Sequence, residues 1–424
     1  MRALSLATIA VAIAGYAVIL VAARGLSASA YEDFMVYWGL FFALAGLLDG
    51  LLQETARAVT ARRSGAGFLE SAPDAQAAPA APFHLTSGFA VVSGLLAAAT
   101  APWWAPVVSP DLQIWGSVLM VVGLVAYAFQ ATVCGLISAA SKWTIFAWLI
   151  AFDSLIRLAL AVWAWLMGWQ LLAFLLVTVI GAATWLLFLL ISPGTRALLS
   201  EKADVGSAAF VNRCLKAMVA SGANAMIITG FPVLLRFTSD ADVAAGALAA
   251  TITAVTLTRA PILVPMQRFQ PALIVHFTKH RGNVLRACLV PMLAVIAVAA
   301  FGGAAAYFLG QTLMGLFFAQ ELVVSASALT VLTVASGSTG LLMITGSAAL
   351  AADRHTLYVA GWIVATIACI ALLLVDTSAE MRSALSLGIG PLVGVALQVA
   401  VLARGERREK SKPQRARAGN GGRK

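Results

Sequence analysis

The chain has 424 residues, of which 61% are hydrophobic and 11% charged, and its mean hydropathy is +0.92. Soluble domains carry about 25% charged residues, so this composition excludes an ordinary water-soluble protein. The formal net charge is +10, but residues 404–424 hold nine basic and two acidic residues and therefore supply seven of these charges. Such a terminal run is typical of a solvated tail beside an anionic membrane surface, which argues against nucleic-acid binding.

Twelve apolar runs are long enough to cross about 30 Å of hydrocarbon as helices. They cover residues 5–23, 33–52, 85–105, 113–138, 145–167, 171–191, 215–236, 246–267, 284–309, 322–350, 359–375 and 383–403. The first run is longer than the apolar region of a secretory signal peptide, so we expect it to remain as a membrane helix. The pattern predicts an all-α polytopic membrane protein.

Basic residues lie unequally on the two sides of these spans. With the N-terminus in the cytoplasm, 23 Lys and Arg residues fall on the cytoplasmic side and three on the outer side, namely Arg24, Arg236 and Arg382. The positive-inside rule then places both termini in the cytoplasm. The cytoplasmic linker 192–214 separates an N-terminal six-helix lobe, 1–191, from a C-terminal six-helix lobe, 215–403. We expect a flexible loop at 64–84 and a disordered basic tail at 404–424.

Several charged residues lie within or at the ends of the spans, where charge at the bilayer centre costs about 2.5–3.5 kcal/mol. Asp153 and Arg157 are four residues apart and share one helix face, which indicates either a self-neutralising pair or the wall of a charge-binding cavity. Asp49, Glu54 and Arg57 close the second span. Glu54 is expected at a helix end that leaves the membrane, whereas Asp49 lies deeper.

Two further arginines occupy spans one and eight. Arg24 is at the outer end of the first span, where its side chain could simply reach the interface. Arg259 is followed by Pro261 and Pro265, which remove backbone donors and predict a bend. An arginine beside such a bend favours a functional role.

Motifs for catalysis or metal binding are not found in the sequence. His276 and His280 have helical spacing but no third ligand nearby, and their basic neighbours indicate a cytoplasmic surface. The four cysteines are far apart and form no CxxC pair, and no Walker or HExxH motif occurs. We therefore predict no catalytic residue, metal or cofactor.

Three short motifs together resemble a known family. They are Arg24 before Gly-Leu-Ser-Ala-Ser-Ala-Tyr, Gln53-Glu54-x-x-Arg57, and Arg259-Ala-Pro. With twelve spans in two halves, the chain resembles the polysaccharide-flippase branch of the multidrug/oligosaccharidyl-lipid/polysaccharide (MOP) exporter superfamily. The resemblance implies two lobes around a central cavity that opens alternately to either side. It also implies a cargo of polyprenyl-linked sugar.

Arginines at the end of helix one, in helix two and in helix eight line the cavity in relatives that flip the lipid-linked peptidoglycan precursor. The resemblance therefore implies that Arg24, Arg57 and Arg259 bind cargo phosphate, and Arg157 is a fourth candidate. Gly25 stands where an acid is common, and that branch usually has two further C-terminal helices. The peptidoglycan precursor itself is therefore not assigned.

We expect a non-enzymatic, monomeric flippase in the bacterial cytoplasmic membrane that moves a polyprenyl-(pyro)phosphate-linked glycan outward for envelope polysaccharide synthesis. Asp153, Asp49 and Glu54 are candidates for ion coupling. The expected partners are the lipid-linked glycan, membrane lipid and glycan-assembly enzymes recruited by the tail. The alternatives are a cation-coupled multidrug antiporter, a membrane glycosyltransferase and a non-transporting scaffold. For a glycosyltransferase, the outer loops offer only Asp240 and Asp242 as a close acidic pair.

Overall fold

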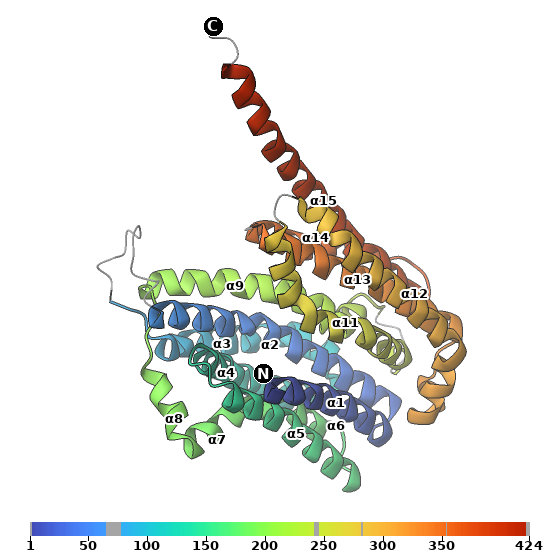
Figure 1. Cartoon of the computed structure of the whole chain (residues 1–424). Helices are drawn as coiled ribbons and strands as arrows, with labels where there is room; N and C mark the ends of the chain where they lie inside the picture. The colour runs from blue at the N-terminus through green and yellow to red at the C-terminus, as the bar shows by residue number, and fades with distance from the viewer. Residues whose placement is uncertain (1, 65–77, 241–245, 281–282, 353, 421–424) are drawn as a thin grey trace. The chain divides into compact units, whose positions relative to one another are not determined.

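A computed structural model describes residues 2–64, 78–240, 246–280, 283–352 and 354–420 (Figure 1), with side chains except at 2–5, 268, 271 and 406–420. This part of the chain is almost entirely helical, and its one β-interaction is an isolated bridge between Pro79 and Gly206. The helices are α1 Arg2–Gly25, α2 Ala28–Arg63, α3 Pro82–Val108, η1 Pro110–Leu112, α4 Gln113–Ala139, α5 Trp143–Leu166, α6 Leu171–Ile180, η2 Gly181–Ala183, α7 Thr184–Ile191, α8 Pro193–Arg196, η3 Ala197–Ser200, α9 Ser207–Ile228, α10 Phe231–Phe237, α11 Ala249–Lys279, α12 Val284–Phe317, η5 Gln320–Leu322, α13 Ala326–Ala351, α14 His355–Leu373 and α15 Ala379–Asn420.

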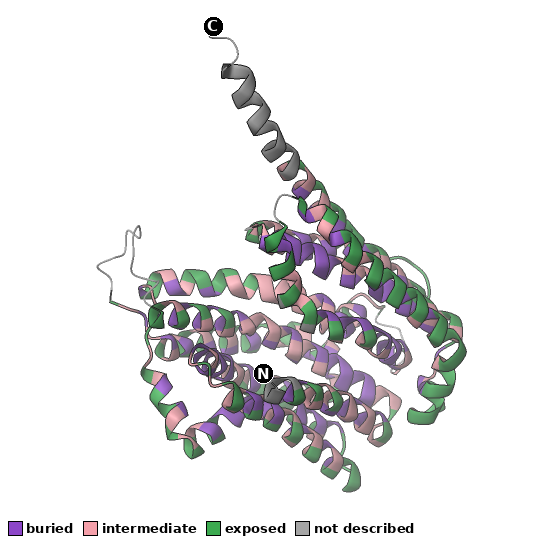
Figure 2. Ribbon diagram, viewed as in Figure 1, coloured by how far each residue is buried: buried purple, intermediate pink, exposed green. Residues whose placement is uncertain are grey.

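The protein is a multi-pass membrane protein. Among the described residues, 11 helices are long and apolar enough to cross a membrane, or 12 when α9 and α10 are counted as one bent span. Large apolar side chains, including Trp103, Phe301 and Phe308, point outward, and α12 is exposed along most of its length (Figure 2). Such surfaces suit hydrocarbon and not water. The all-α polytopic class with about twelve membrane helices is confirmed.

Two of the expected spans are interrupted. Span six is divided by the 3₁₀ turn η2 between α6 and α7. Span seven bends by 71° between α9 and α10, where Gly230 is followed by Phe231 and Pro232. Proline at the start of α10 lacks the N–H that would continue the α9 hydrogen-bond ladder, which accounts for the break.

The chain separates into two compact units, unit 1 at Met1–Ala249 and unit 2 at Ala250–Lys424. This boundary lies after the seventh expected span, 215–236. The reason is the close contact of α9 with α2 (Figure 1), where Gly46 faces Ala225 and Gly50 faces the Met218 backbone. Small residues four apart allow two membrane helices to approach this closely. The division into two six-helix lobes stays a prediction.

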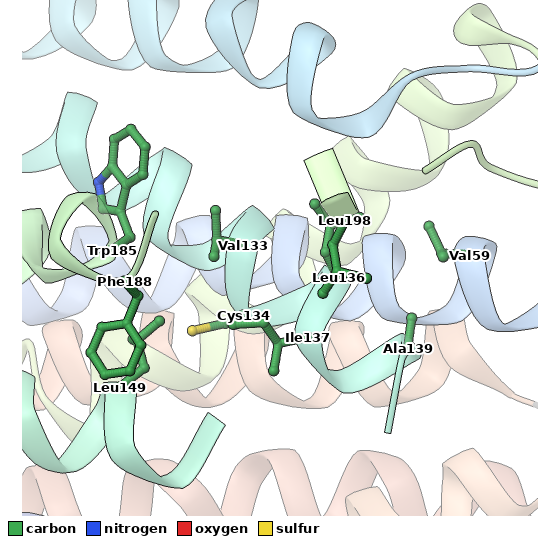
Figure 3. Close-up of a cluster of buried hydrophobic side chains, with 10 residues drawn as sticks. All are labelled: Val59, Val133, Cys134, Leu136, Ile137, Ala139, Leu149, Trp185, Phe188 and Leu198. Carbon is green, nitrogen blue, oxygen red and sulfur yellow. The ribbon is translucent and has the colours of Figure 1, made fainter. Parts of the chain in front are cut away.

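The core of unit 1 joins four spans at one end. Its cluster of buried apolar side chains comes from α2, α4, α5, α7 and η3 (Figure 3) and comprises Val59, Val133, Cys134, Leu136, Ile137, Ala139, Leu149, Trp185, Phe188 and Leu198. Trp185 stacks on Phe129, with 5.3 Å between the ring centroids. This packing fixes α7, which follows the η2 turn, against α4.

Unit 2 is organised around α13, its most buried helix. The Thr345 hydroxyl of α13 donates to Oε1 of Gln398 on α15 at 2.5 Å, and Nε2 of Gln398 donates to the Tyr358 carbonyl of α14 at 3.4 Å. One buried amide therefore links three helices.

The structure describes most of the basic tail but only part of the expected flexible loop. α15 continues to Asn420, so most of the tail 404–424, which we expected to be disordered, is helical. Its Ala, Arg, Lys, Glu and Gln residues have high helix propensity and extend a helix already begun in the membrane. Residues 65–77 of the expected flexible loop 64–84 lie outside the described residues.

Candidate functional site

Asp153 and Arg157 form an ion pair inside the membrane-spanning helix α5. The distance from Arg157 Nη2 to Asp153 Oδ1 is 2.9 Å, and the arginine is 4% exposed. The guanidinium carbon also lies 4.9 Å from the ring centroid of Phe42 and 5.9 Å from that of Phe41. The expectation that the two charges share one face is confirmed. The carboxylate and the aromatic rings compensate a charge that the surrounding apolar helices would not tolerate alone.

The ion pair packs against the break in span six. A Cβ added at Gly181 would overlap Asp153 Oδ1 and Arg157 Nε, so only glycine leaves room for the pair. Gln130 of α4, with its amide nitrogen turned toward the break, donates to the Gly181 and Ala182 carbonyls, both at 3.0 Å. The Gly181 carbonyl also accepts from the Thr184 N–H within the 3₁₀ turn, and the glutamine adds side-chain bonds that tie the break to α4.

Asp49 lies close to this pair. The Tyr127 hydroxyl of α4 donates to Asp49 Oδ1 of α2 at 2.8 Å. The Tyr127 ring lies 6.3 Å from the Phe41 ring, whose centroid is 5.9 Å from the Arg157 guanidinium carbon. We call Asp49, Tyr127, Asp153 and Arg157 the polar centre of unit 1. The centre brings together two of the acids that the sequence singled out for ion coupling, from two different helices.

Arg57 is held by carboxylates on both sides at the end of α2. Its Nε and Nη2 donate to Glu54 at 2.8 and 2.6 Å, and its Nη1 and Nη2 donate to Asp204 at 3.1 Å each. Arg57 is 43% exposed, whereas both carboxylates are 7% exposed. Arg24 lies elsewhere, exposed in the last turn of α1. Arg24 and Arg57 both lie toward the C-terminal ends of their helices. Because α1 and α2 are consecutive spans, we expect these two arginines at opposite faces of the membrane.

Arg259 is the corresponding buried cation of unit 2. It is 4% exposed on α11. α11 stays helical across Pro261 and Pro265, the positions where the sequence predicted a bend. Because Arg259 belongs to unit 2 and the other three arginines to unit 1, their role in one shared cavity stays a prediction. No group of three His, Cys, Asp or Glu side chains in the described part of the chain is placed to hold a metal ion.

Comparison with known proteins shows close relatives in mycobacteria. The uncharacterized protein Mb3654 of Mycobacterium bovis is 36% identical over 398 residues, covering 94% of this chain and 90% of the relative. The uncharacterized protein Rv1510 of Mycobacterium tuberculosis is 37% identical over 390 residues, covering 92% and 88%. The chain belongs to this mycobacterial protein family. No family model matches the sequence.

Solved structures similar to this family member share its fold at low sequence identity. An inward-facing multidrug resistance MATE family transporter of the MOP superfamily matches with a TM-score of 0.67 and 13% identity over 94% of this chain and 95% of the other. A MOP superfamily transporter from Pyrococcus furiosus matches with a TM-score of 0.66 and 12% identity over 95% of each chain. The mycobacterial family therefore has the MATE/MOP transporter fold, as the superfamily resemblance implied. Membership in the polysaccharide-flippase branch stays a prediction.

Sequence reasoning missed the residues that surround the singled-out charges in this family member. Tyr127 and Gln130 are polar residues inside the apolar fourth span, and that contrast alone could have marked them. Gly181 carried no signal, because glycine is common in membrane helices. Asp204 lies in the linker 192–214 and carried no signal, since its partner Arg57 is 147 residues away in the chain.

Proposed function

We propose that this protein is a flippase for a polyprenyl-(pyro)phosphate-linked sugar or oligosaccharide, which it moves between leaflets by alternating access. The fold supports the coarser part of this proposal, since the similar solved structures are transporters. The finer part, an anionic lipid-linked cargo, rests on the positions and chemistry of the arginines.

The observation that carries the proposal is the burial of Arg259 within a membrane-spanning helix. Guanidinium keeps its proton at any physiological pH, so Arg259 brings a permanent positive charge into the apolar part of unit 2. Intramembrane charges of this kind face the bundle interior or a water-filled cavity and mark transport pathways. The phosphate of a lipid-linked sugar matches the forked donors of arginine, and the lipid tail can stay in the bilayer.

The polar centre of unit 1 is the candidate for ion coupling. Asp153 is already paired with Arg157, whereas Asp49 accepts its bond from a hydroxyl. Asp49 can therefore gain or lose a proton without breaking an ion pair, which makes it the first acid to test. Glu54 forms an ion pair with Arg57, so it can take part in ion coupling only if that pair separates.

A cation-coupled multidrug antiporter is the second candidate function, and two observations favour it. Several similar solved structures are multidrug MATE transporters, and the polar centre holds two acids in the membrane. The Pyrococcus furiosus structure is titled "Reverse polarity of binding pocket suggests different function", so within this fold the charge of the pocket differs between transporters. The buried arginines of the present chain favour an anionic cargo over a cationic drug.

Reconstitution with a labelled lipid-linked sugar tests the proposal. The wild-type chain is placed in proteoliposomes with a fluorescent polyprenyl-pyrophosphate-linked sugar, and the label that reaches the opposite leaflet is quenched by dithionite. The matched variants are Arg259→Gln and Arg286→Gln, since Arg286 is an exposed arginine near the start of α12. We expect Arg259→Gln to slow flipping by about tenfold or more, and Arg286→Gln to leave the rate unchanged.

Two results would contradict the proposal. One is flipping by wild type that equals empty liposomes for every lipid-linked sugar tried. The other is equal rates for Arg259→Gln and wild type. Efflux of cationic dyes from the same proteoliposomes under a proton or sodium gradient, lost on Asp49→Asn, would instead establish the antiporter.

A further inference from the structure

The guanidinium of Arg57 makes two bidentate pairs at once. Its Nε–Nη2 edge binds the Glu54 carboxylate and its Nη1–Nη2 end binds the Asp204 carboxylate. Glu54 is three residues away on the same helix, so it orients the side chain locally. Asp204 comes from the segment between η3 and α9 and is the exchangeable partner.

A second guanidinium approaches the same carboxylate from α9. Arg213 Nη1 lies 3.9 Å from Asp204 Oδ2, and the Arg213 side chain is 44% exposed. Asp204 itself is 7% exposed. A single small carboxylate is therefore enclosed by two arginines from two helices that are themselves open to solvent.

Residues 201–206 present Asp204 to these arginines as an extended strap. The Asp204 N–H donates to the Ala58 carbonyl of α2 at 3.2 Å, and the Ala203 N–H donates to the Ala80 carbonyl at 2.9 Å. Arg62 Nη1 adds a 3.3 Å bond to the Ala203 carbonyl. The Ala80 N–H also donates to the Val205 carbonyl at 2.9 Å, and Pro79 and Gly206 form an isolated bridge, so withdrawal of the strap must break this pairing together with the Arg57–Asp204 pair.

We propose that the Asp204 carboxylate occupies an anion-binding site of Arg57 and Arg213, and that a phosphate or pyrophosphate group takes its place when the strap 201–206 withdraws. The chemistry fits, because carboxylate and phosphate oxygens present the same acceptor spacing to a guanidinium fork. With Asp204 withdrawn, two guanidinium groups face one remaining carboxylate, Glu54, and the site carries a net positive charge.

The charge count along the sequence places this site on the cytoplasmic side, where a cargo headgroup would enter. That the bound group is the headgroup of a lipid-linked sugar rests on the proposed function. The site itself does not, since free phosphate and lipid phosphate share the chemistry. In either case the strap acts as an internal competitor that keeps the arginines occupied while no anion is present.

Binding of inorganic pyrophosphate to the full chain in phosphatidylcholine nanodiscs tests the proposal by isothermal titration calorimetry. Asp204→Asn keeps the shape of the side chain but removes its charge. We expect this variant to bind pyrophosphate about tenfold more tightly than wild type at low salt, with affinity falling as salt rises. The double variant Asp204→Asn/Arg213→Gln is expected to lose that gain. Asp376→Asn is the matched control, because Asp376 is an exposed acid outside the strap, and it should change affinity less than twofold.

The proposal is overturned if Asp204→Asn binds like wild type, or if its gain survives loss of Arg213. If Asp204→Asn fails to fold, the variant Arg213→Gln tests the proposal by itself. The Arg213 side chain is exposed and lies 3.9 Å from Asp204, so its loss should not unfold the protein. The proposal requires Arg213→Gln to bind pyrophosphate more weakly than wild type. A further arm uses nanodiscs that contain phosphatidic acid. If phosphatidic acid reduces pyrophosphate binding, the site also binds lipid phosphate. If pyrophosphate binding is unchanged, the ligand of the site is the soluble anion. Tight pyrophosphate binding by a chain that flips no lipid-linked sugar would support this anion site and contradict the proposed function.

Discussion

Glu32 and Arg236 are 204 residues apart in the chain, yet Arg236 Nη1 donates to Glu32 Oε1 at 2.6 Å. The second oxygen of Glu32 accepts from the Leu248 N–H at 2.8 Å, and Arg236 Nε donates to the Val107 carbonyl at 3.3 Å. One carboxylate, 1% exposed, thus joins the N-terminal part of α2 to the end of α10 and to the segment that begins α11. All four residues lie at span ends that the charge pattern places on the outer side.

The Glu32–Arg236 pair predicts that neutralising Glu32 and neutralising Arg236 lower the unfolding free energy by different amounts. Glu32→Gln removes charge-assisted bonds and is expected to cost about 2 kcal/mol of unfolding free energy. Arg236→Gln leaves the buried carboxylate without its cation and is expected to cost more, about 3 kcal/mol. Thermal unfolding in detergent measures both, with Asp376→Asn at an exposed acid as the control. A larger loss for Glu32→Gln than for Arg236→Gln would show that the ion pair is not what stabilises this junction.

The ion pair of the polar centre predicts recovery in a double substitution. Asp153→Asn leaves the buried Arg157 guanidinium without its carboxylate and should lower the unfolding free energy by about 3–5 kcal/mol. Replacing both residues by leucine removes both charges from the apolar interior, so Asp153→Leu/Arg157→Leu should be more stable than Asp153→Asn. The same thermal unfolding assay compares them, and a double variant less stable than the single one contradicts this account. Flipping by a stable double variant would also remove Asp153 from ion coupling.

Gly181, the one glycine of span six, is predicted to be intolerant of any side chain. Gly181→Ala places a methyl group onto Asp153 Oδ1 and Arg157 Nε, so the pair or the helix break must shift, at a cost of about 1–3 kcal/mol. Gly15→Ala in α1 is the matched control, because a Cβ there meets nothing within 4 Å. Unfolding midpoints of the two variants in the same detergent give the comparison. Equal midpoints would mean that the pair does not depend on the close approach of the η2 backbone.

The predicted orientation can be measured independently of transport. Single cysteines are introduced at Ser64 and at Ser239, both next to span ends, in a background with the four native cysteines replaced by serine or alanine. Ser64 lies at the end that the positive-inside rule places in the cytoplasm, and Ser239 at the outer end. We expect a membrane-impermeant maleimide to label the cysteine at 239 in intact cells and that at 64 only after lysis. The reverse pattern would invert every assignment of side, including that of the Arg57 site.

The sequence alone determined the membrane class, the positions of the spans and the shared helix face of Asp153 and Arg157. These features are local: a membrane helix satisfies its own backbone, so length and apolarity suffice to find it, and residues four apart meet on one face whatever surrounds them. Only the tertiary structure decided that Arg57 is held by Asp204, that Gln130 and Gly181 frame the break in span six, and that Glu32 meets Arg236. Those contacts depend on which helix faces pack together, and in an apolar bundle almost any face is compatible with the local sequence. The chemical role of the charged residues that the sequence marked as unusual depends on these distant partners.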